Sequence, residues 1–308
     1  MQRILVTPRS LTASRHPAVE RLREFGYEVV YCEAGKAPSE QDLLRLTPDI
    51  VGWLAGVEPV SEAVIAGARR LRAISRNGVG VDNLPLAALS QREIALRTAG
   101  GANAQGVAEL AIGLMFSAIR HIPLADSGIK SGRWPRHIGR EIHGRTVGVV
   151  GYGAIGREVA RLAGALGAKV LACDPLPQAA NSDSLVRHVD LEALIAESEI
   201  VTLHCPAAAD GRPVLSAPQL ARCRHGAVIV NTARASLVDD KAMIEALNAG
   251  QVATYAVDVF NEEPPRELTL VSDPRVIATA HIGGYTEESV DRATTAAVDN
   301  LLEALSGI

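Results

Sequence analysis

Residues 146–174 read TVGVVGYGAIGREVARLAGALGAKVLACD, and this stretch decides the fold. A β-branched apolar run at its start predicts a strand, and Gly151, Gly153 and Gly156 predict a tight turn after it. Apolar residues at helical spacing follow, and a second apolar run ends at Asp174. The pattern therefore predicts a βαβ unit whose second strand ends in an acid.

Each of these residues has a physical use in binding a dinucleotide. Gly151 allows the sharp turn, Gly153 lets the backbone approach a pyrophosphate, and Gly156 lets the helix lie close to the strand. The helix N-terminus, with its unpaired N–H groups, favours the phosphates. Asp174 would accept hydrogen bonds from a ribose diol and repel a 2′-phosphate, so the sequence predicts NAD rather than NADP.

The bulk composition excludes several classes of partner. The chain has 308 residues, enough for two domains, and a net charge of -4 that favours neither nucleic acid nor an anionic membrane. The apolar runs are too short for a membrane span, and the N-terminus has no signal-peptide pattern, so we expect a cytoplasmic protein. Its cysteines form no C-x-x-C pair, which predicts reduced thiols and no metal site.

Apolar runs and helical patterns alternate along the whole chain, which predicts two doubly wound parallel α/β sheets. A glycine-rich segment, TAGGANA at 98–104, resembles a hinge, so we expect domains at 1–98 and 99–284, with the helix of 285–308 able to return to the first. The expected strands outside the βαβ unit are 4–7, 28–31, 50–54, 71–75, 94–97, 200–204, 227–231, 253–257 and 276–280.

One loop of the first domain is a candidate substrate contact. Arg76, Asn77, Gly78 and Val79 follow a predicted strand at the carboxyl edge of the sheet, where open α/β sheets bind ligands. The glycines would leave backbone N–H groups open to an anion. An ordinary turn with a solvated Arg76 is the alternative.

The segment 121–145 is polar and basic, with Trp134 between Arg133 and Arg136. It is either a solvated helical excursion or an arm that forms a homodimer.

Polar residues follow the later strands of the second domain, at the same edge as the glycine turn. They include His204, Arg234, Asp258, Glu262, Glu263 and His281. An arginine, an acid and a histidine from this set would suit the oxidation of an alcohol beside a carboxylate: histidine takes the hydroxyl proton, a carboxylate raises its pKa, and arginine holds the anion. Singly, each could be a solvated or capping residue, and His204 could be a satisfied histidine beside a buried strand.

Read together, GYGAIG, Asp174-Pro175, LHCP, NTAR, DVFNEEPP and AHIGG resemble the NAD-dependent D-isomer-specific 2-hydroxyacid dehydrogenases. The resemblance implies a Rossmann-type NAD-binding domain inserted into a flavodoxin-like substrate domain. It also implies that Arg234, Glu263 and His281 are catalytic.

The resemblance further implies the contacts of cofactor and substrate. The substrate, a small anionic 2-hydroxy or 2-keto acid, would meet Arg76, Asn77, Gly78, Val79, Arg234 and His281. The implied NAD-binding residues are Gly151, Gly153, Ala154, Ile155, Gly156, Asp174, Pro175, His204, Cys205, Pro206, Thr232, Ala233, Arg234, Asp258, His281 and Gly283.

Within the family, SRNGVGVDN and SGRWPRH most resemble phosphoglycerate dehydrogenases, where an arginine matching Arg76 helps hold the phosphorylated substrate and the basic arm comes from a second subunit. Ala235 stands where Gly is commoner and Ala99 where Pro is usual, so glyoxylate or hydroxypyruvate reduction is the alternative. An NAD-sensing, corepressor-like binding protein is the alternative of another class.

Overall fold

The computed structural model describes residues 1–175, 185–208 and 210–307, and the chain divides into two compact units. Unit 1 is Met1–Asn103 with Thr286–Ile308, and unit 2 is Ala104–Tyr285. The expected boundaries after 98 and after 284 therefore shift to after 103 and after 285. The first shifts because the glycine-rich segment is bonded into unit 1. There the Ala99 N–H donates to Gly78 O (3.0 Å), and Arg292 Nε donates to Ala102 O (2.9 Å).

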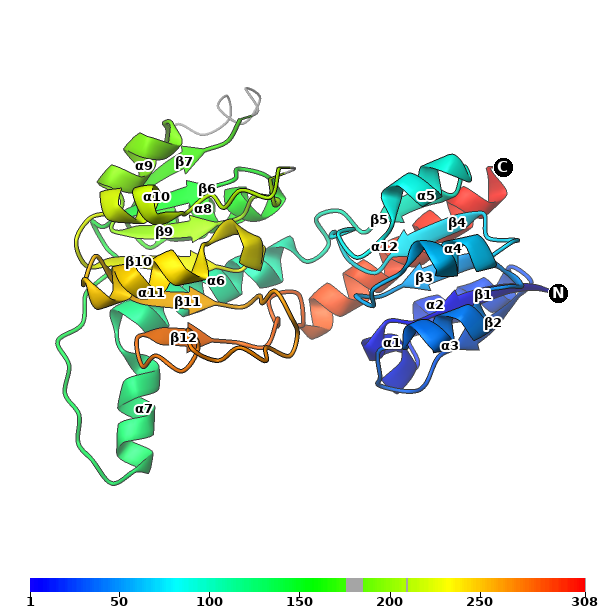
Figure 1. The fold of residues 1–308 in the computed structure, drawn as a ribbon, viewed down its shortest axis with the longest axis horizontal. Helices are drawn as coiled ribbons and strands as arrows, with labels where there is room; N and C mark the ends of the chain where they lie inside the picture. The colour runs from blue at the N-terminus through cyan, green and yellow to red at the C-terminus, as the bar shows by residue number, and fades with distance from the viewer. Residues whose placement is uncertain (176–184, 209, 308) are drawn as a thin grey trace. The chain divides into compact units, whose positions relative to one another are not determined.

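Unit 1 is an all-parallel sheet in the order β2-β1-β3-β4-β5, which is the flavodoxin-like order and confirms the predicted class. Its long helix α12 is capped by the Thr286 hydroxyl, which accepts the Ser289 N–H, and it packs on one face of the sheet (Figure 1). The approach is close, since a Cβ on Gly52 would lie 3.0 Å from Leu305 Cδ1. The elements of unit 1 are β1 (Gln2–Val6), α1 (Arg9–Ala13), α2 (Pro17–Glu24), β2 (Tyr27–Tyr31), α3 (Glu40–Leu46), β3 (Ile50–Ala55), α4 (Glu62–Gly67), β4 (Ala73–Arg76), α5 (Leu86–Gln91), β5 (Ala95–Thr98) and α12 (Glu287–Ser306).

Unit 2 is a parallel sheet in the order β12-β11-β10-β9-β6-β7-β8. If β6 is taken as the first strand, this is the strand order of the predicted Rossmann-type domain, with β12 added at one edge. The short strand β8 was not among the expected ones. The elements are α6 (Ala104–Ile119), α7 (Ile122–Lys130), β6 (Thr146–Val150), α8 (Ala154–Ala165), β7 (Lys169–Cys173), β8 (Val186–His188), α9 (Leu191–Glu197), β9 (Ile200–Leu203), α10 (Ala217–Arg222), β10 (Ala227–Asn231), the 3-10 helix η2 (Ala235–Leu237), α11 (Asp240–Asn248), β11 (Val252–Val257) and β12 (Val276–Ala278).

The apolar helix α6 is a core helix of unit 2. Ala108, Ala111 and Met115 on it are fully buried, and it packs against α8 and β10. No single helix in the described part of the chain is long and apolar enough to cross a membrane. Only α6 and α7 taken together pass that test, and they are bent by 65° at the break between them.

The glycine turn between β6 and α8 is packed as tightly as the sequence predicts. A Cβ on Gly156 would lie 1.9 Å from Gly151 O, so the helix can reach the strand only without a side chain there. Gly151 has φ +92, and a Cβ on it would lie 2.6 Å from Cys205 N. Nothing lies within 4 Å of a Cβ on Gly153, which leaves open space beside the helix N-terminus.

We expect Gly156→Ala to lower the midpoint of thermal unfolding by several degrees, because overpacking of this kind costs about 1–3 kcal/mol. Gly164→Ala in the same helix is the matched control. Its Cβ meets open space, and alanine stabilises a helix by about 1 kcal/mol relative to glycine. Equal midpoints for the two variants would contradict the close approach of α8 to the turn.

Candidate active site

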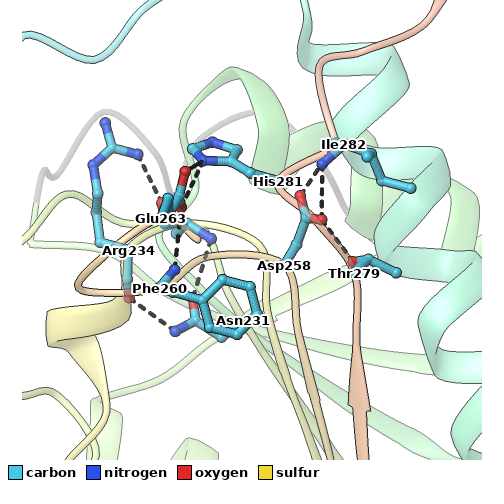
Figure 2. Close-up of polar contacts among 10 residues, drawn as sticks. Asn231, Arg234, Asp258, Phe260, Glu263, Thr279, His281 and Ile282 are labelled. Carbon is cyan, nitrogen blue, oxygen red and sulfur yellow. Dashed lines mark hydrogen bonds and ion pairs between the residues drawn. The ribbon is translucent and has the colours of Figure 1, made fainter. Parts of the chain in front are cut away.

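The strand β10 ends in a turn that presents Arg234. Asn231 is fully buried, and its Nδ2 donates to Arg234 O (2.8 Å) while its Oδ1 accepts the Ala233 N–H (3.1 Å). Arg234 Nη1 donates to Ala233 O (2.7 Å), and the half-buried guanidinium extends beyond the strand end (Figure 2). The buried amide thus fixes the backbone from which the guanidinium projects.

His281 and Glu263 form an ion pair after β12 and β11. Both carboxylate oxygens of Glu263 lie 2.9 Å from His281 Nδ1, and Glu263 Oε1 also accepts the Phe260 N–H (3.2 Å) (Figure 2). The hydrogen bond that His281 Nδ1 donates to Glu263 raises the pKa of His281, and partial burial lowers it. The charge of Asp258 raises this pKa further, and the charge of Arg234 lowers it. The raised pKa keeps the imidazole protonated to higher pH than an ordinary histidine.

The His281–Glu263 pair also makes the stability of the fold depend on pH. Because the pKa of His281 is higher in the folded state, the pair stabilises the fold fully below the ordinary histidine pKa of about 6.5. That contribution is lost as the pH rises through the raised value. The side chains of His281 and Glu263 are 46% and 39% exposed, so solvent weakens the contribution.

Asp258 holds the turn on which His281 sits. Its side chain is buried, and its Oδ1 accepts the Thr279 hydroxyl (2.6 Å) and the Ile282 N–H (2.9 Å). Its Oδ2 accepts the Gly283 N–H (2.9 Å). These bonds shape the loop around His281, which has the left-handed φ of +53. That Asp258 and Gly283 contact the cofactor stays a prediction.

The residues expected to hold a dinucleotide fit that ligand. Gly153 is the N-cap of the twelve-residue helix α8, and no side chain caps this helix. The backbone N–H groups of its first turn can therefore bind an anion in the open space beside Gly153. Asp174 Oδ2 accepts the Tyr152 N–H (2.7 Å), which holds the carboxylate at the turn. Pro175 follows at the surface, next to residues 176–184, which lie outside the described part of the chain.

Two neighbouring strand ends present buried polar atoms that have no partner in the described residues. They are His204 Nδ1, after β9, and Thr232 Oγ1, after β10. Burial lowers the pKa of His204 to about 3, and its Nε2 lies 2.8 Å from Thr202 Oγ1, so this imidazole is neutral. Burial raises the pKa of the adjacent Cys205 thiol to about 11, so that thiol stays protonated.

The predicted substrate loop belongs to unit 1, and there Arg76 is not a solvated side chain. Arg76 is 5% exposed, with Nε donating to Gly80 O (2.7 Å) and Nη1 to Gly56 O. The Asn77 N–H donates to Ala55 O (2.9 Å). The sequence reasoning missed Glu58, which is buried beside this loop and carries no local signal of burial. No group of three or more His, Cys, Asp or Glu side chains in the described residues is arranged to hold a metal ion.

The chain is similar in sequence to known proteins. Residues 112–283 match the model of the family described as D-isomer specific 2-hydroxyacid dehydrogenase, NAD binding domain. The chain is 37% identical over 277 residues to a D-3-phosphoglycerate dehydrogenase of Archaeoglobus fulgidus, covering 88% of this chain and 52% of the relative. It is 35% identical over 272 residues to a hydroxypyruvate reductase of Thermotoga maritima, covering 86% of this chain and 88% of the relative.

Solved structures give the same fold. The TT0316 protein from Thermus thermophilus superposes with a TM-score of 0.88 at 31% identity, covering 99% of this chain and 97% of that one. A glyoxylate reductase from Paecilomyes thermophila superposes with a TM-score of 0.86 at 28% identity, covering 99% of this chain and 95% of that one. The chain spans about half the length of the D-3-phosphoglycerate dehydrogenases it matches.

We expect Glu263→Gln to lower the pKa of His281, because the amide removes the negative charge that stabilises the imidazolium. NMR titration of the imidazole resonances measures the change. Glu262→Gln is the matched control, since the Glu262 carboxylate pairs with Arg266 Nε (2.9 Å) instead. A His281 pKa that is the same in the wild type and Glu263→Gln would contradict the assigned pairing.

Proposed function

The chain belongs to the D-isomer-specific 2-hydroxyacid dehydrogenase family, and from this premise we propose that it transfers hydride between NAD(H) and a small D-2-hydroxy acid or its 2-keto acid. The observation that carries the proposal is the His281–Glu263 pair, which leaves an imidazole at the strand ends that also present Arg234. An isolated surface histidine would not need a carboxylate on Nδ1.

The roles of the side chains follow from their atoms. His281 Nδ1 donates a hydrogen bond to the Glu263 carboxylate. Nε2 is therefore the atom that takes the hydroxyl proton in oxidation and returns it in reduction. Arg234 grips the carboxylate of the acid with its planar fork. When bound, the nicotinamide accepts or gives the hydride. Asp258 positions His281 through the backbone of the turn.

The proposed cofactor is NAD rather than NADP. Asp174 stands at the end of β7 with its carboxylate tied to the turn by the Tyr152 N–H, where a 2′-phosphate would meet its charge. The pyrophosphate would lie on the N-terminus of α8, over Gly153, Ala154 and Ile155. The strand ends at His204, Cys205, Pro206, Thr232 and Ala233 would line the rest of the dinucleotide.

Two substrates are supported by different observations. The sequence and the relatives named D-3-phosphoglycerate dehydrogenase favour 3-phosphoglycerate and phosphohydroxypyruvate. The guanidinium of Arg76 donates hydrogen bonds to Gly80 O and Gly56 O, and this favours an unphosphorylated acid instead. The relative named hydroxypyruvate reductase favours the same choice. Oxidation of NADH and of NADPH with glyoxylate, hydroxypyruvate, pyruvate and phosphohydroxypyruvate separates these candidates. It also distinguishes an enzyme from an NAD-sensing binding protein.

We expect His281→Asn to reduce kcat for the best 2-keto acid by about 10² to 10⁴ while NADH binding and the unfolding midpoint stay close to those of the wild type. Asparagine tolerates the left-handed backbone of this position but cannot carry the proton. Steady-state kinetics and NADH fluorescence titration provide the two measurements. Turnover close to that of the wild type would rule out His281 as the proton carrier.

We further propose that 121–145 forms the arm of a homodimer. Figure 1 shows α7 and the segment after it extending away from the sheet of unit 2. Large apolar side chains on this arm face solvent, above all Trp134 at 80% and Ile138 at 98% exposed. The arm is anchored rather than loose, since Arg140 Nη1 donates to Gly226 O (2.9 Å). Exposed apolar surface of this kind is typical of an interface.

We expect the double variant Trp134→Glu with Ile138→Glu to sediment as a monomer, because two carboxylates on the arm would be desolvated in a dimer. Phe25→Glu is the control, a charge placed on an exposed apolar residue of unit 1. Analytical ultracentrifugation measures the mass. A wild-type protein that is already monomeric at micromolar concentration would contradict the proposal.

A further inference from the structure

A hollow with basic walls, the basic hollow, lies at the amino-terminal edge of the sheet of unit 2. Three adjacent strands of the sheet, β10, β9 and β6, begin at this edge. The volume of the hollow is about 300 Å³, which suits a small ligand. Its lining consists of Arg140 and of residues that directly precede the three strands: Arg145 before β6, Glu199 before β9, and Arg224, His225 and Gly226 before β10.

The basic hollow is separate from the proposed active site. Neighbouring strands of this sheet are parallel, so β6, β9 and β10 begin at the hollow and end at the edge that carries the glycine turn and Arg234. The strands β6 and β10 each have five residues, which places the two edges about 16 Å apart. A ligand in the hollow would therefore leave the dinucleotide site free.

Two of the guanidinium groups are already held in place. Arg140 Nη1 donates to Gly226 O (2.9 Å), and a Cβ on Gly226, which has φ +74, would lie 3.0 Å from Arg140 Nη2. The guanidinium thus lies directly against the glycine backbone. Arg145 Nε donates to Glu141 O (3.2 Å), and its Nη1 pairs with Glu199 Oε1 (2.6 Å). Less side-chain freedom is lost on binding when the binding groups are fixed beforehand.

The acid in the lining, Glu199, compensates only part of the positive charge. Its Oε1 pairs with Arg145, and its Oε2 accepts the Thr146 N–H (3.2 Å). Burial raises the pKa of Glu199, but these hydrogen bonds and the charges of Arg145 and Arg224 bring it below its ordinary value. Glu199 is therefore ionised and neutralises Arg145.

The other two arginines keep an uncompensated charge. Within residues 1–175, 185–208 and 210–307, neither Arg140 nor Arg224 has an ion-pair partner, and the side chains of Arg224 and His225 make no hydrogen bond. Arg140 uses one N–H on Gly226 O, and a guanidinium has five. Two positive charges and several N–H donors therefore face one small volume.

We propose that the basic hollow binds a small anion that carries a phosphate group, held by Arg140 and Arg224. The planar fork of a guanidinium matches the oxygens of phosphate, and a dianion compensates both free charges whereas a single carboxylate compensates only one. Inorganic phosphate and a phosphate ester share this chemistry. The site is independent of the proposed reaction, because no residue of the hollow takes part in it.

The test uses substitutions of Arg224, which is exposed and lies outside the proposed active site. Arg224→Gln removes the charge and the fork, and Arg224→Lys keeps the charge without the fork. Arg222→Gln is the matched control. This exposed arginine lies two residues earlier, outside the hollow, and pairs with Glu192 Oε2 (2.9 Å).

The unfolding midpoint of each variant is measured against inorganic phosphate at constant ionic strength, with chloride as the balancing anion. A ligand raises the midpoint according to its affinity. Arg224→Gln should need about ten times more phosphate than the wild type for the same rise, the effect of one charge-assisted hydrogen bond. Arg222→Gln should respond like the wild type, and Arg224→Lys should lie between. The N-terminus of α8 is the same in every variant, so a difference between variants reports the hollow.

Equal responses of the wild type and Arg224→Gln, or a wild type that phosphate does not stabilise, would overturn the inference. Titration with glycerol 3-phosphate distinguishes the two sources of phosphate: a larger rise than with inorganic phosphate, reduced in Arg224→Gln, assigns the site to an ester, and an equal or smaller rise assigns it to the free ion. Analytical ultracentrifugation tests another occupant. A dimer lost in Arg224→Gln, without any response to phosphate, would place an acidic side chain of a second copy in the hollow and refute the anion site.

Discussion

The buried carboxylate of Asp258 is the interaction on which the arrangement of the site depends. It accepts one hydroxyl and two backbone N–H groups around His281, and the described residues offer those two amides no other acceptor. Leaving a buried donor unsatisfied costs about 1–3 kcal/mol. His281 itself has a left-handed φ of +53, a conformation that costs energy in a non-glycine residue. Asp258 offsets that cost, and so directs the imidazole toward Glu263.

The two units fix their loops by the same physical means. Each is a parallel sheet whose loops lie at the carboxyl ends of its strands, and in each a buried polar residue holds the loop that follows. In unit 2 Asn231 and Asp258 shape the turns that carry Arg234 and His281. In unit 1 Glu58 and Arg76 do the same for the turn at 76–80. Rigid strand ends therefore position side chains that the loops alone could not fix.

Much of this could be predicted from the sequence, because the signals were local. The glycine turn and the apolar runs predicted both sheets to within one or two residues at most strand ends, since periodicity and glycine sterics act over a few positions. Glu58 could not be found in this way. Its partner Thr7 lies 51 residues away, and an acid between Val57 and Pro59 is typical of an exposed loop. The burial of Arg76 was equally beyond local signals, because it depends on the neighbouring strand.

Two histidines at strand ends of unit 2, His204 and His281, show how the environment decides which can carry a proton. His204 Nε2 lies 2.8 Å from the Thr202 hydroxyl, and burial lowers its pKa to about 3, so this imidazole stays neutral near neutral pH. His281 is half-exposed and bound to a carboxylate, and its pKa rises. A proton carrier must change charge near neutral pH. The lowered pKa of His204 makes it unsuited to that role, whereas the carboxylate of Glu263 raises the pKa of His281. A position at a strand end is therefore insufficient, because the paired acid distinguishes the two histidines.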